Sequence, residues 1–315
     1  MNPLSALYGA AVRARNGLFD HGMIPLNRLE GPMVSIGNLA VGGSGKTPFL
    51  ILLGELLKQR GIAFDVLSRG YRRRTKGVSI VDPNGSARDF GDEPLLIARK
   101  LEVPVVVGED RRQAGEMAEA TFGAQLHLLD DGFQHRRLAR DFDIVMVTPT
   151  DAQDSLLPWG RLREPLASLS RADAVVLTND ASTDGLQLQK QQVWRVRRDI
   201  VSPETKELCF AFCGIARPEN FFTQLRAAQV VLAGTRSFRD HYHYSEEDVH
   251  DLQRLRVQAG ARAFVTTEKD ALNLGTNLQA LQPIHVVPVR MKLGDADAAL
   301  DAMLARIAER RQRAA

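Results

Sequence analysis

The stretch GNLAVGGSGKTP at residues 37–48 has the residue types and spacing of a phosphate-binding loop. Its glycines let consecutive backbone N–H groups point inward at phosphate oxygens, and a helix that starts after the loop adds favourable partial charge. The lysine would then reach the β and γ phosphates of a nucleotide, and the threonine hydroxyl would bind Mg²⁺. The expected nucleotide-binding residues are Gly42, Gly43, Ser44, Gly45, Lys46 and Thr47.

The loop departs from the strict pattern G-x-x-x-x-G-K-[ST] at one position, where Ala40 replaces the first glycine. Ala40 precedes the tight part of the loop, so we expect its methyl group to be tolerated. A glycine-rich turn with a chance Lys-Thr pair is the alternative interpretation.

Asp130 and Asp131 stand at the end of the apolar run LHLL, residues 126–129. A carboxylate at the end of such a strand holds Mg²⁺ in proteins with a phosphate loop. Two adjacent buried acids are costly unless a cation or hydrogen bonds compensate them. The sequence therefore predicts a magnesium site with Thr47, Asp130 and Asp131 as ligands, and the alternative is a turn formed by Asp-Asp-Gly.

The nucleotide is expected to be ATP rather than GTP. A guanine site would need an Asn-Lys-x-Asp motif after a strand. The LTND stretch at 177–180 lacks the lysine, and the TTEKD stretch at 266–270 lacks the asparagine.

Two residues are candidates for activating an acceptor hydroxyl. Asp92, in GDEP, stands before the helical run LLIARKL, where it could also be a helix N-cap. His241 precedes a helix that Ser245 is expected to cap together with Asp248, and it could also be an ordinary loop residue. A carboxylate that orients a neutral imidazole is a standard way to activate a hydroxyl, so we expect two lobes to bring Asp92 and His241 together.

Short strands rich in Val, Ile and Leu alternate with helical patterns from residue 32 onward. Nearly continuous apolar strands indicate burial on both faces, and the alternation indicates a doubly wound, mostly parallel α/β sheet. Ligands bind such sheets at the carboxyl ends of the strands, where the motifs above are found. The expected strands lie at 32–37, 64–70, 103–108, 126–131, 143–147 and 173–179, with a helix at about 46–60.

The pattern changes near residue 190. Strand-like runs at 193–200 and 207–215 are predicted to form a hairpin that joins two lobes. The predicted domains are 1–192, a nucleotide-binding domain with an N-terminal helix, and 193–315, the linker with a smaller α/β unit and a C-terminal helix. Elements expected in the second part are helices at 218–228, from 245 and from about 295, and strands at 229–234, 261–267 and 284–289.

The bulk composition limits the class of protein. A net charge of +3, from 41 basic and 38 acidic residues, argues against a dedicated nucleic-acid binder. Two cysteines are too few for a disulfide framework or a four-ligand zinc site. No apolar run reaches the roughly 18 residues of a membrane span, and Arg13 and Arg15 interrupt any signal peptide, so we expect a location on the cytoplasmic side.

The N-terminal residues are predicted to form a helix with one apolar stripe, since Leu4, Leu7, Tyr8, Ala11 and Val12 follow helical spacing. The stripe could pack against the protein's own core or lie in a membrane interface. The sequence leaves both alternatives open.

Eight motifs in order carry a family likeness: GNLAVGGSGKTP, SRGY, GDEP, DDGFQHRRLARD, GRLREP, CGIARPENFF, DHYHY and TTEKDA. They closely resemble the tetraacyldisaccharide 4'-kinase family of lipid A synthesis over about residues 30–290. The resemblance implies a P-loop NTPase-like fold with two α/β lobes joined by a two-stranded linker. It also implies transfer of the γ-phosphoryl group from ATP, with Mg²⁺, to the 4'-hydroxyl of an acylated glucosamine disaccharide 1-phosphate at the cytoplasmic face of the inner membrane.

The resemblance also implies roles for individual residues. Asp92 and His241 match the catalytic pair, and an amphiphilic phosphorylated substrate would explain both an interfacial helix and arginines around the cleft. No nucleic acid and no obligate protein partner is expected. The chain departs from the family pattern at Asn273, where a basic residue is common. Positions that resemble lipid or phosphate contacts are Asp20, Arg69, Arg111 and Arg161.

A second hypothesis is a P-loop switch or chaperone that hydrolyses nucleotide to drive a change of shape. Such a protein would bind a protein partner. Its second lobe would supply no base to the nucleotide cleft.

Overall fold

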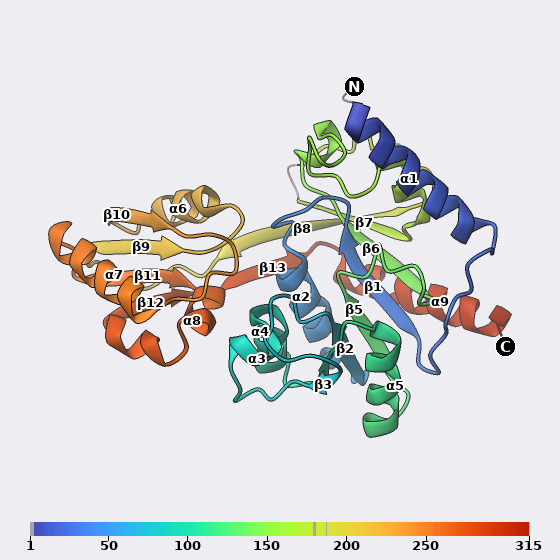
Figure 1. Cartoon of the computed structure of the whole chain (residues 1–315), viewed down its shortest axis with the longest axis horizontal. Helices are drawn as coiled ribbons and strands as arrows, with labels where there is room; N and C mark the ends of the chain where they lie inside the picture. Colours follow the sequence, from blue (N-terminus) through green and yellow to red (C-terminus); the bar gives the residue numbers. More distant parts are fainter. Residues whose placement is uncertain (1–2, 179–180, 187, 315) are drawn as a thin grey trace.

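The computed structural model describes residues 3–178, 181–186 and 188–314, which form two lobes (Figure 1). The larger lobe has a nine-stranded sheet of order β13-β8-β7-β6-β1-β5-β2-β4-β3, and the smaller has a four-stranded sheet of order β10-β9-β11-β12. The strands of the large sheet are β1 (Met33–Asn38), β2 (Phe64–Ser68), β3 (Ser79–Ile80), β4 (Val105–Val107), β5 (Leu126–Asp130), β6 (Phe142–Met146), β7 (Ala174–Thr178), β8 (Gln192–Ile200) and β13 (Val289–Leu293). Those of the small sheet are β9 (Cys209–Cys213), β10 (Leu232–Ser237), β11 (Ala263–Thr267) and β12 (Ile284–Val287).

Helices cover both faces of the large sheet. α2, α4 and α9 share one hydrophobic core with the sheet, and α5 packs on the opposite face. The helices are α1 (Pro3–Asp20), α2 (Lys46–Gln59), α3 (Ala87–Phe90), α4 (Asp92–Leu101), α5 (Arg111–Phe122), α6 (Pro218–Ala227), α7 (Glu246–Gln258), α8 (Glu268–Leu274) and α9 (Ala296–Ala314), with 3₁₀ turns η1 (Asp151–Gln153), η2 (Leu166–Arg171) and η3 (Gly275–Leu281).

The predicted doubly wound parallel sheet is confirmed. The seven neighbouring strands β8, β7, β6, β1, β5, β2 and β4 pair in parallel. The edge strands β3 and β13 pair with β4 and β8 in antiparallel register. β1, β2, β5 and β6 are buried along their whole length, which explains their continuous apolar sequences. The chain builds one side of β1 with β2, β4 and β5 and the other side with β6 to β8, so the carboxyl end of β1 lies at the switch point where such sheets bind ligands.

The predicted hairpin between residues 193–200 and 207–215 is wrong. β8 pairs with β7 and, in antiparallel register, with β13, whereas β9 belongs to the small sheet. The apolar side chains Trp194 and Val196 are buried in the core of the large lobe and hold β8 in that sheet. β8 and β13 are therefore the two strands that connect the lobes (Figure 1).

The C-terminal segment returns to the large lobe after the small one. Leu300, Met303 and Ile307 of α9 are buried in the same core as α2 and α4. The division of the chain at residue 193 stays a prediction, to which the structure adds that β13 and α9 pack with the first part of the chain.

The N-terminal helix forms, but its buried face shares only Val12 with the predicted stripe. Its buried residues are Ser5, Gly9, Val12, Asn16 and Phe19, while Leu4 and Leu7 are 55% and 69% exposed. The small residues Ser5 and Gly9 let the helix approach the loop that contains Leu156 closely. The Ser5 hydroxyl donates to the carbonyl of Leu156 at 2.9 Å. Among the described residues, no helix combines the length and apolarity that a membrane span requires.

Gly37 in β1 provides a test of the packing at the switch point. A Cβ atom there would lie 2.5 Å from Cβ and 2.9 Å from the backbone N of Phe133, which is fully buried. We predict that Gly37→Ala lowers the free energy of unfolding by about 1–3 kcal/mol, measured by urea denaturation. Gly17→Ala is the control, since an added Cβ there meets no atom within 4 Å. Equal stability of the two variants would contradict this packing.

Candidate active site

The phosphate loop lies between β1 and α2, at the switch point of the sheet. Gly42 and Gly45 have φ values of 98° and 85°, which favour glycine, and α2 begins at Lys46 without a side-chain cap. Its first backbone N–H groups are thus left for a ligand. Ala40 is buried and forms a bridge with Leu162, so its methyl group lies in the core rather than in the tight turn.

Lys46 lies across the mouth of this loop. Its Nζ donates to Oδ1 of Asn38 at 3.1 Å and forms an ion pair with Asp131 at 3.2 Å. Asn38 also donates to the carbonyl of Ala40 and to the hydroxyl of Ser44, at 2.6 and 3.0 Å. Asn38 therefore organises the loop, a role that the sequence interpretation missed although the residue stands inside the motif.

The two acids follow β5 beside the loop. The Ser68 hydroxyl donates to Oδ2 of Asp130 at 2.9 Å, and Oδ1 of Asp130 is buried without a hydrogen-bond partner among the described residues. Asp131 adopts a φ of 50° and accepts from Arg163 at 2.9 Å. Thr47 is buried at the start of α2, and its role as a metal ligand together with these carboxylates stays a prediction.

The pKa values of Asp130 and Asp131 are shifted in opposite directions. Burial, with the negative charges of Glu93 and Asp131, raises the pKa of Asp130 to about 7. Burial also opposes ionisation of Asp131, but Lys46 and Arg163 outweigh it and lower that pKa. An unpaired, buried carboxylate oxygen next to a second carboxylate and a hydroxyl suits a hard cation such as Mg²⁺.

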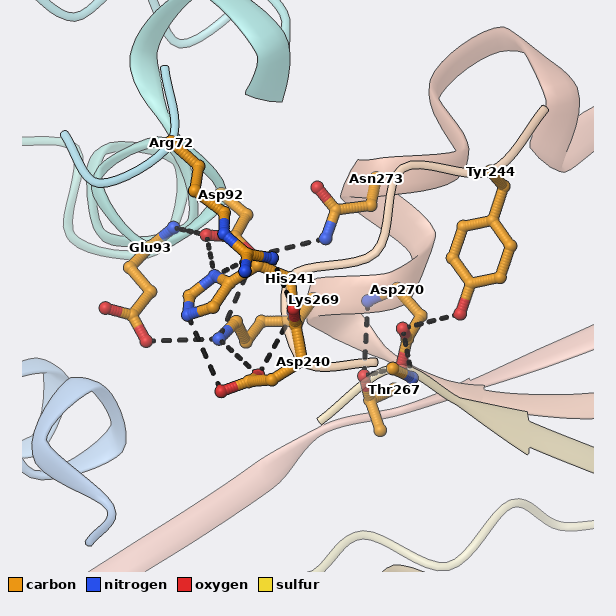
Figure 2. Close-up of polar contacts among 11 residues, drawn as sticks. Arg72, Asp92, Glu93, Asp240, His241, Tyr244, Thr267, Lys269, Asp270 and Asn273 are labelled. Atoms are coloured by element: carbon orange, nitrogen blue, oxygen red, sulfur yellow. Dashed lines mark hydrogen bonds and ion pairs between the residues drawn. The ribbon is translucent and has the colours of Figure 1, made fainter. Parts of the chain in front are cut away.

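Asp92 and His241 meet across the lobes (Figure 2). Asp92 is the first residue of α4, is 3% exposed, and has both carboxylate oxygens 2.9 Å from Nδ1 of His241. His241 lies in the loop between β10 and α7 with a φ of 57°. The helix after this loop begins with the predicted capping box of Ser245 and Asp248.

The pair is strongly polarised. Burial would raise the pKa of Asp92, but Lys269, His241 and Asn273 outweigh it and lower that pKa well below its usual range. Burial opposes a charged imidazole, yet the pKa of His241 is raised because Asp92 and Asp240 outweigh burial and the charge of Lys269. Asp92 is therefore the anion of the pair, and the imidazole, with its raised pKa, is the group that gains or loses a proton.

Lys269 ties the lobes together at the same place. Its Nζ lies 3.1 Å from Glu93 and 3.8 Å from both Asp92 and Asp240 (Figure 2). Although burial opposes its charge, these carboxylates raise the pKa of Lys269. The sequence interpretation assigned no role to this lysine, because its partners lie far away along the chain.

A buried carboxylate in the small lobe supports the loop that carries His241. Asp270 accepts hydrogen bonds from the N–H of Gly214 and the hydroxyl of Tyr244, both at 2.7 Å, and from Thr267 at 2.5 Å. The N–H of His241 in turn donates to the carbonyl of Gly214 at 3.2 Å. The imidazole is thus held on a rigid frame.

The small lobe also borders the phosphate loop. A Cβ added at Gly43 would lie 3.3 Å from the methyl group of Ala216, in the loop that follows β9. Arg217 donates to the Thr150 hydroxyl of the large lobe at 3.4 Å. The small lobe therefore contacts the large lobe both beside the phosphate loop and at Asp92.

The four predicted substrate contacts fall into different surroundings. Arg69 is exposed and lies near the buried Arg111, whose pKa is lowered by burial and by the charge of Arg69. Asp20, at the end of α1, pairs with Arg136 at 2.6 Å. Arg161 pairs with Asp154 at 2.7 Å and donates to Thr150, beside the small lobe.

Of the two stretches that lack a complete guanine motif, LTND lies partly and TTEKD wholly within the described residues. In LTND, residues 179 and 180 lie outside the described residues. In TTEKD, Thr267 caps α8 and Asp270 is buried in the hydrogen-bonded frame described above.

Comparison with known proteins agrees with this geometry. Residues 1–308 match the family model of LpxK, tetraacyldisaccharide-1-P 4'-kinase. Relatives called tetraacyldisaccharide 4'-kinase include one from Koribacter versatilis, 52% identical over 99% of this chain and 100% of its own, and one from Aquifex aeolicus, 34% identical over 92% and 93%. The crystal structure of LpxK from Aquifex aeolicus in complex with ATP matches with a TM-score of 0.79 and 33% identity over 97% of both chains. This chain belongs to the tetraacyldisaccharide-1-P 4'-kinase family.

Proposed function

We propose that this protein is an ATP-dependent kinase that phosphorylates the 4'-hydroxyl of a tetraacyl glucosamine disaccharide 1-phosphate in lipid A synthesis. The observation that carries the proposal is the contact between Asp92 of the large lobe and His241 of the small lobe, and it is supported by the approach of Ala216 of the small lobe to Gly43 of the phosphate loop. Family membership and the ATP complex of the Aquifex aeolicus relative support it.

The phosphate loop would bind the nucleotide through its backbone. The N–H groups of residues 42–45 and of the start of α2 would donate to phosphate oxygens, and Lys46 would contact the β and γ phosphates. Asn38 and Asp131 hold the ammonium group of Lys46 beside the loop, in a position suited to this contact.

Thr47, Asp130 and Asp131 would hold Mg²⁺. Their all-oxygen donor set fits this ion, which is usually bound by one or two carboxylates together with substrate phosphates. A bound Mg²⁺ would neutralise charge that develops on the β and γ phosphates. Since burial and neighbouring acids raise the pKa of Asp130 to about 7, ion binding requires that carboxyl group to lose its proton.

His241 would act as the general base. Nδ1–H donates to the Asp92 carboxylate, which leaves the lone pair of Nε2 to accept the proton of the sugar hydroxyl. The hydroxyl oxygen then forms a bond to the γ-phosphorus while the bond between that phosphorus and the bridging β–γ oxygen breaks, and ADP leaves. Asp92 stabilises the imidazolium that results.

The acceptor would be a lipid presented at the cytoplasmic face of the inner membrane. The exposed residues Leu4 and Leu7 of α1 and the exposed Trp159 give the large lobe apolar side chains suited to a membrane interface. Arg69, Arg111, Asp20 and Arg161 would contact the sugar and its phosphate, since arginine binds phosphate through two parallel hydrogen bonds. This proposal requires no nucleic acid and no protein partner.

Replacement of Lys46 tests the phosphate loop. We predict that Lys46→Ala lowers kcat/KM for ATP by about 100-fold or more, because the substitution removes the ammonium group that would stabilise the negative charge of the transferred phosphate. Lys58→Ala in the same helix is the control, since Lys58 donates to the carbonyl of Leu101. Steady-state kinetics with wild-type values for both variants would refute the assignment.

Replacement of the pair tests whether the two residues act as a unit. Asp92→Asn and His241→Ala should each lower kcat by about 10²–10⁴, and the double variant should be no slower than the slower single variant. His250→Ala, an exposed histidine of α7, should be unaffected. Losses that multiply would show independent roles. ATP turnover that needs no lipid acceptor, with full activity in His241→Ala, would favour the hydrolytic switch instead.

The pH profile follows from the raised pKa of His241. The base must be neutral, so kcat/KM should increase with pH through a midpoint above the ordinary histidine value of about 6.5. Asp92→Asn removes the anion that raises this pKa, and the midpoint in its residual activity should move to lower pH. A midpoint that is the same in both enzymes would exclude His241 as the titrating base.

A further inference from the structure

Helix α8 presents two side chains to the catalytic pair from the small lobe. Lys269 and Asn273 are four residues apart and lie on one face of this helix, which packs against α4. Asp92 is the first residue of α4. The Nδ2 group of Asn273 donates to Oδ2 of Asp92 at 3.1 Å (Figure 2).

Besides His241, two donors bind the carboxylate of Asp92, one at each oxygen. Oδ1 accepts the N–H of Glu93 at 2.9 Å, and Oδ2 accepts the amide of Asn273. With both oxygens fixed, the carboxylate keeps each of them 2.9 Å from Nδ1 of His241. Without Asn273, Oδ2 would be free to rotate toward Lys269, whose Nζ is already 3.8 Å away.

The surroundings of Asn273 point to a polar role rather than to packing. The residue is buried, and its Oδ1 has no hydrogen-bond partner among the described residues. A leucine of similar size would fill the same space without leaving a buried acceptor unpaired. The amide is therefore retained for the hydrogen bond that it donates to Asp92.

We propose that Asn273 is a positioning residue that fixes the carboxylate of Asp92 in the orientation in which it holds the His241 imidazole. The proposal rests on the proposed function only for the consequence to catalysis, because the hydrogen bond itself is independent of it. Asn273 does not touch the reacting atoms and acts through Asp92.

The charged groups around the imidazole determine what a change at position 273 does. They come from every element packed against His241: Asp92 and Glu93 from α4, Lys269 from α8, Arg72 and Arg88 from the neighbouring segment of the large lobe, and Asp240 and His243 from its own loop. The amide of Asn273 stabilises the Asp92 carboxylate by a hydrogen bond and brings no charge of its own. Without the amide donor the Asp92 carboxylate can turn toward Lys269 and away from the imidazole, which lowers the pKa of His241, whereas an acid in place of Asn273 adds an anion and raises that pKa.

The test compares Asn273→Leu, which removes the donor at similar volume, with Asn273→Asp, which replaces it by an acceptor. Two readouts are taken: kcat at saturating ATP, and the titration of His241 followed by NMR of the ¹⁵N-labelled imidazole in the full-length protein. We expect Asn273→Leu to lower kcat about tenfold with an unchanged KM for ATP. Relative to the wild type, the titration midpoint of His241 should decrease in Asn273→Leu and increase in Asn273→Asp.

Asn277→Leu is the matched control, because Asn277 follows one turn later and donates to the carbonyl of Tyr244 at 3.5 Å instead. It should leave both readouts unchanged. A wild-type titration midpoint in both Asn273 variants, with thermal unfolding shifted alone, would reduce Asn273 to a structural residue and overturn the proposal.

The same measurements separate this proposal from the proposed function. If the titration moves as expected while His241→Ala retains full phosphoryl transfer, the positioning role holds and the catalytic role of the pair fails. If His241→Ala is inactive while Asn273→Leu has wild-type kcat and titration, the positioning role fails alone.

Discussion

The buried carboxylate of Asp92 is the constraint on which the arrangement of the two lobes depends. An ionised group that is 3% exposed is stable only if donors replace water, and the large lobe supplies one, the N–H of Glu93. The side-chain donors and the nearby cation, from His241, Asn273 and Lys269, belong to the small lobe. Closure of the lobes and ionisation of Asp92 are therefore linked.

The two lobes contribute different parts of the candidate site. The large lobe provides the switch point of a parallel sheet, where the backbone around β1 and α2 is shaped for phosphate. The small lobe provides the imidazole, mounted on a frame that Asp270 holds from within. β8 and β13 pair with each other where the chain passes between the lobes, so the connection is a two-stranded ribbon rather than a single flexible segment. Such a connection restricts the relative positions that the lobes can take.

Local patterns in the sequence predicted most of the fold and the chemical types of the site. The strands β1, β2 and β4 to β8 of the large sheet, the phosphate loop and the capping box at Ser245 each depend on residues close together in the chain, and each is predicted, whereas the edge strands β3 and β13 are not. The partner of β8 was not, because a strand pattern carries no information about which distant strand it joins. The roles of Asn38, Lys269 and Asn273 were missed for a related reason, since they are defined by contacts to Ala40 and Ser44 or across the lobes rather than by spacing. The packing face of α1 was also missed, because small residues at Ser5 and Gly9, not the apolar stripe, determine the close contact.

The central claim is that a base from the small lobe directs the γ-phosphoryl group of ATP to a sugar hydroxyl rather than to water. Mass spectrometry of a defined tetraacyl disaccharide 1-phosphate, incubated with the protein, ATP and Mg²⁺, tests it most directly. We expect the lipid to gain one phosphoryl group, at the 4'-position, for each ADP formed. ADP and free phosphate formed in equal amounts, with the mass of the lipid unchanged, would contradict it.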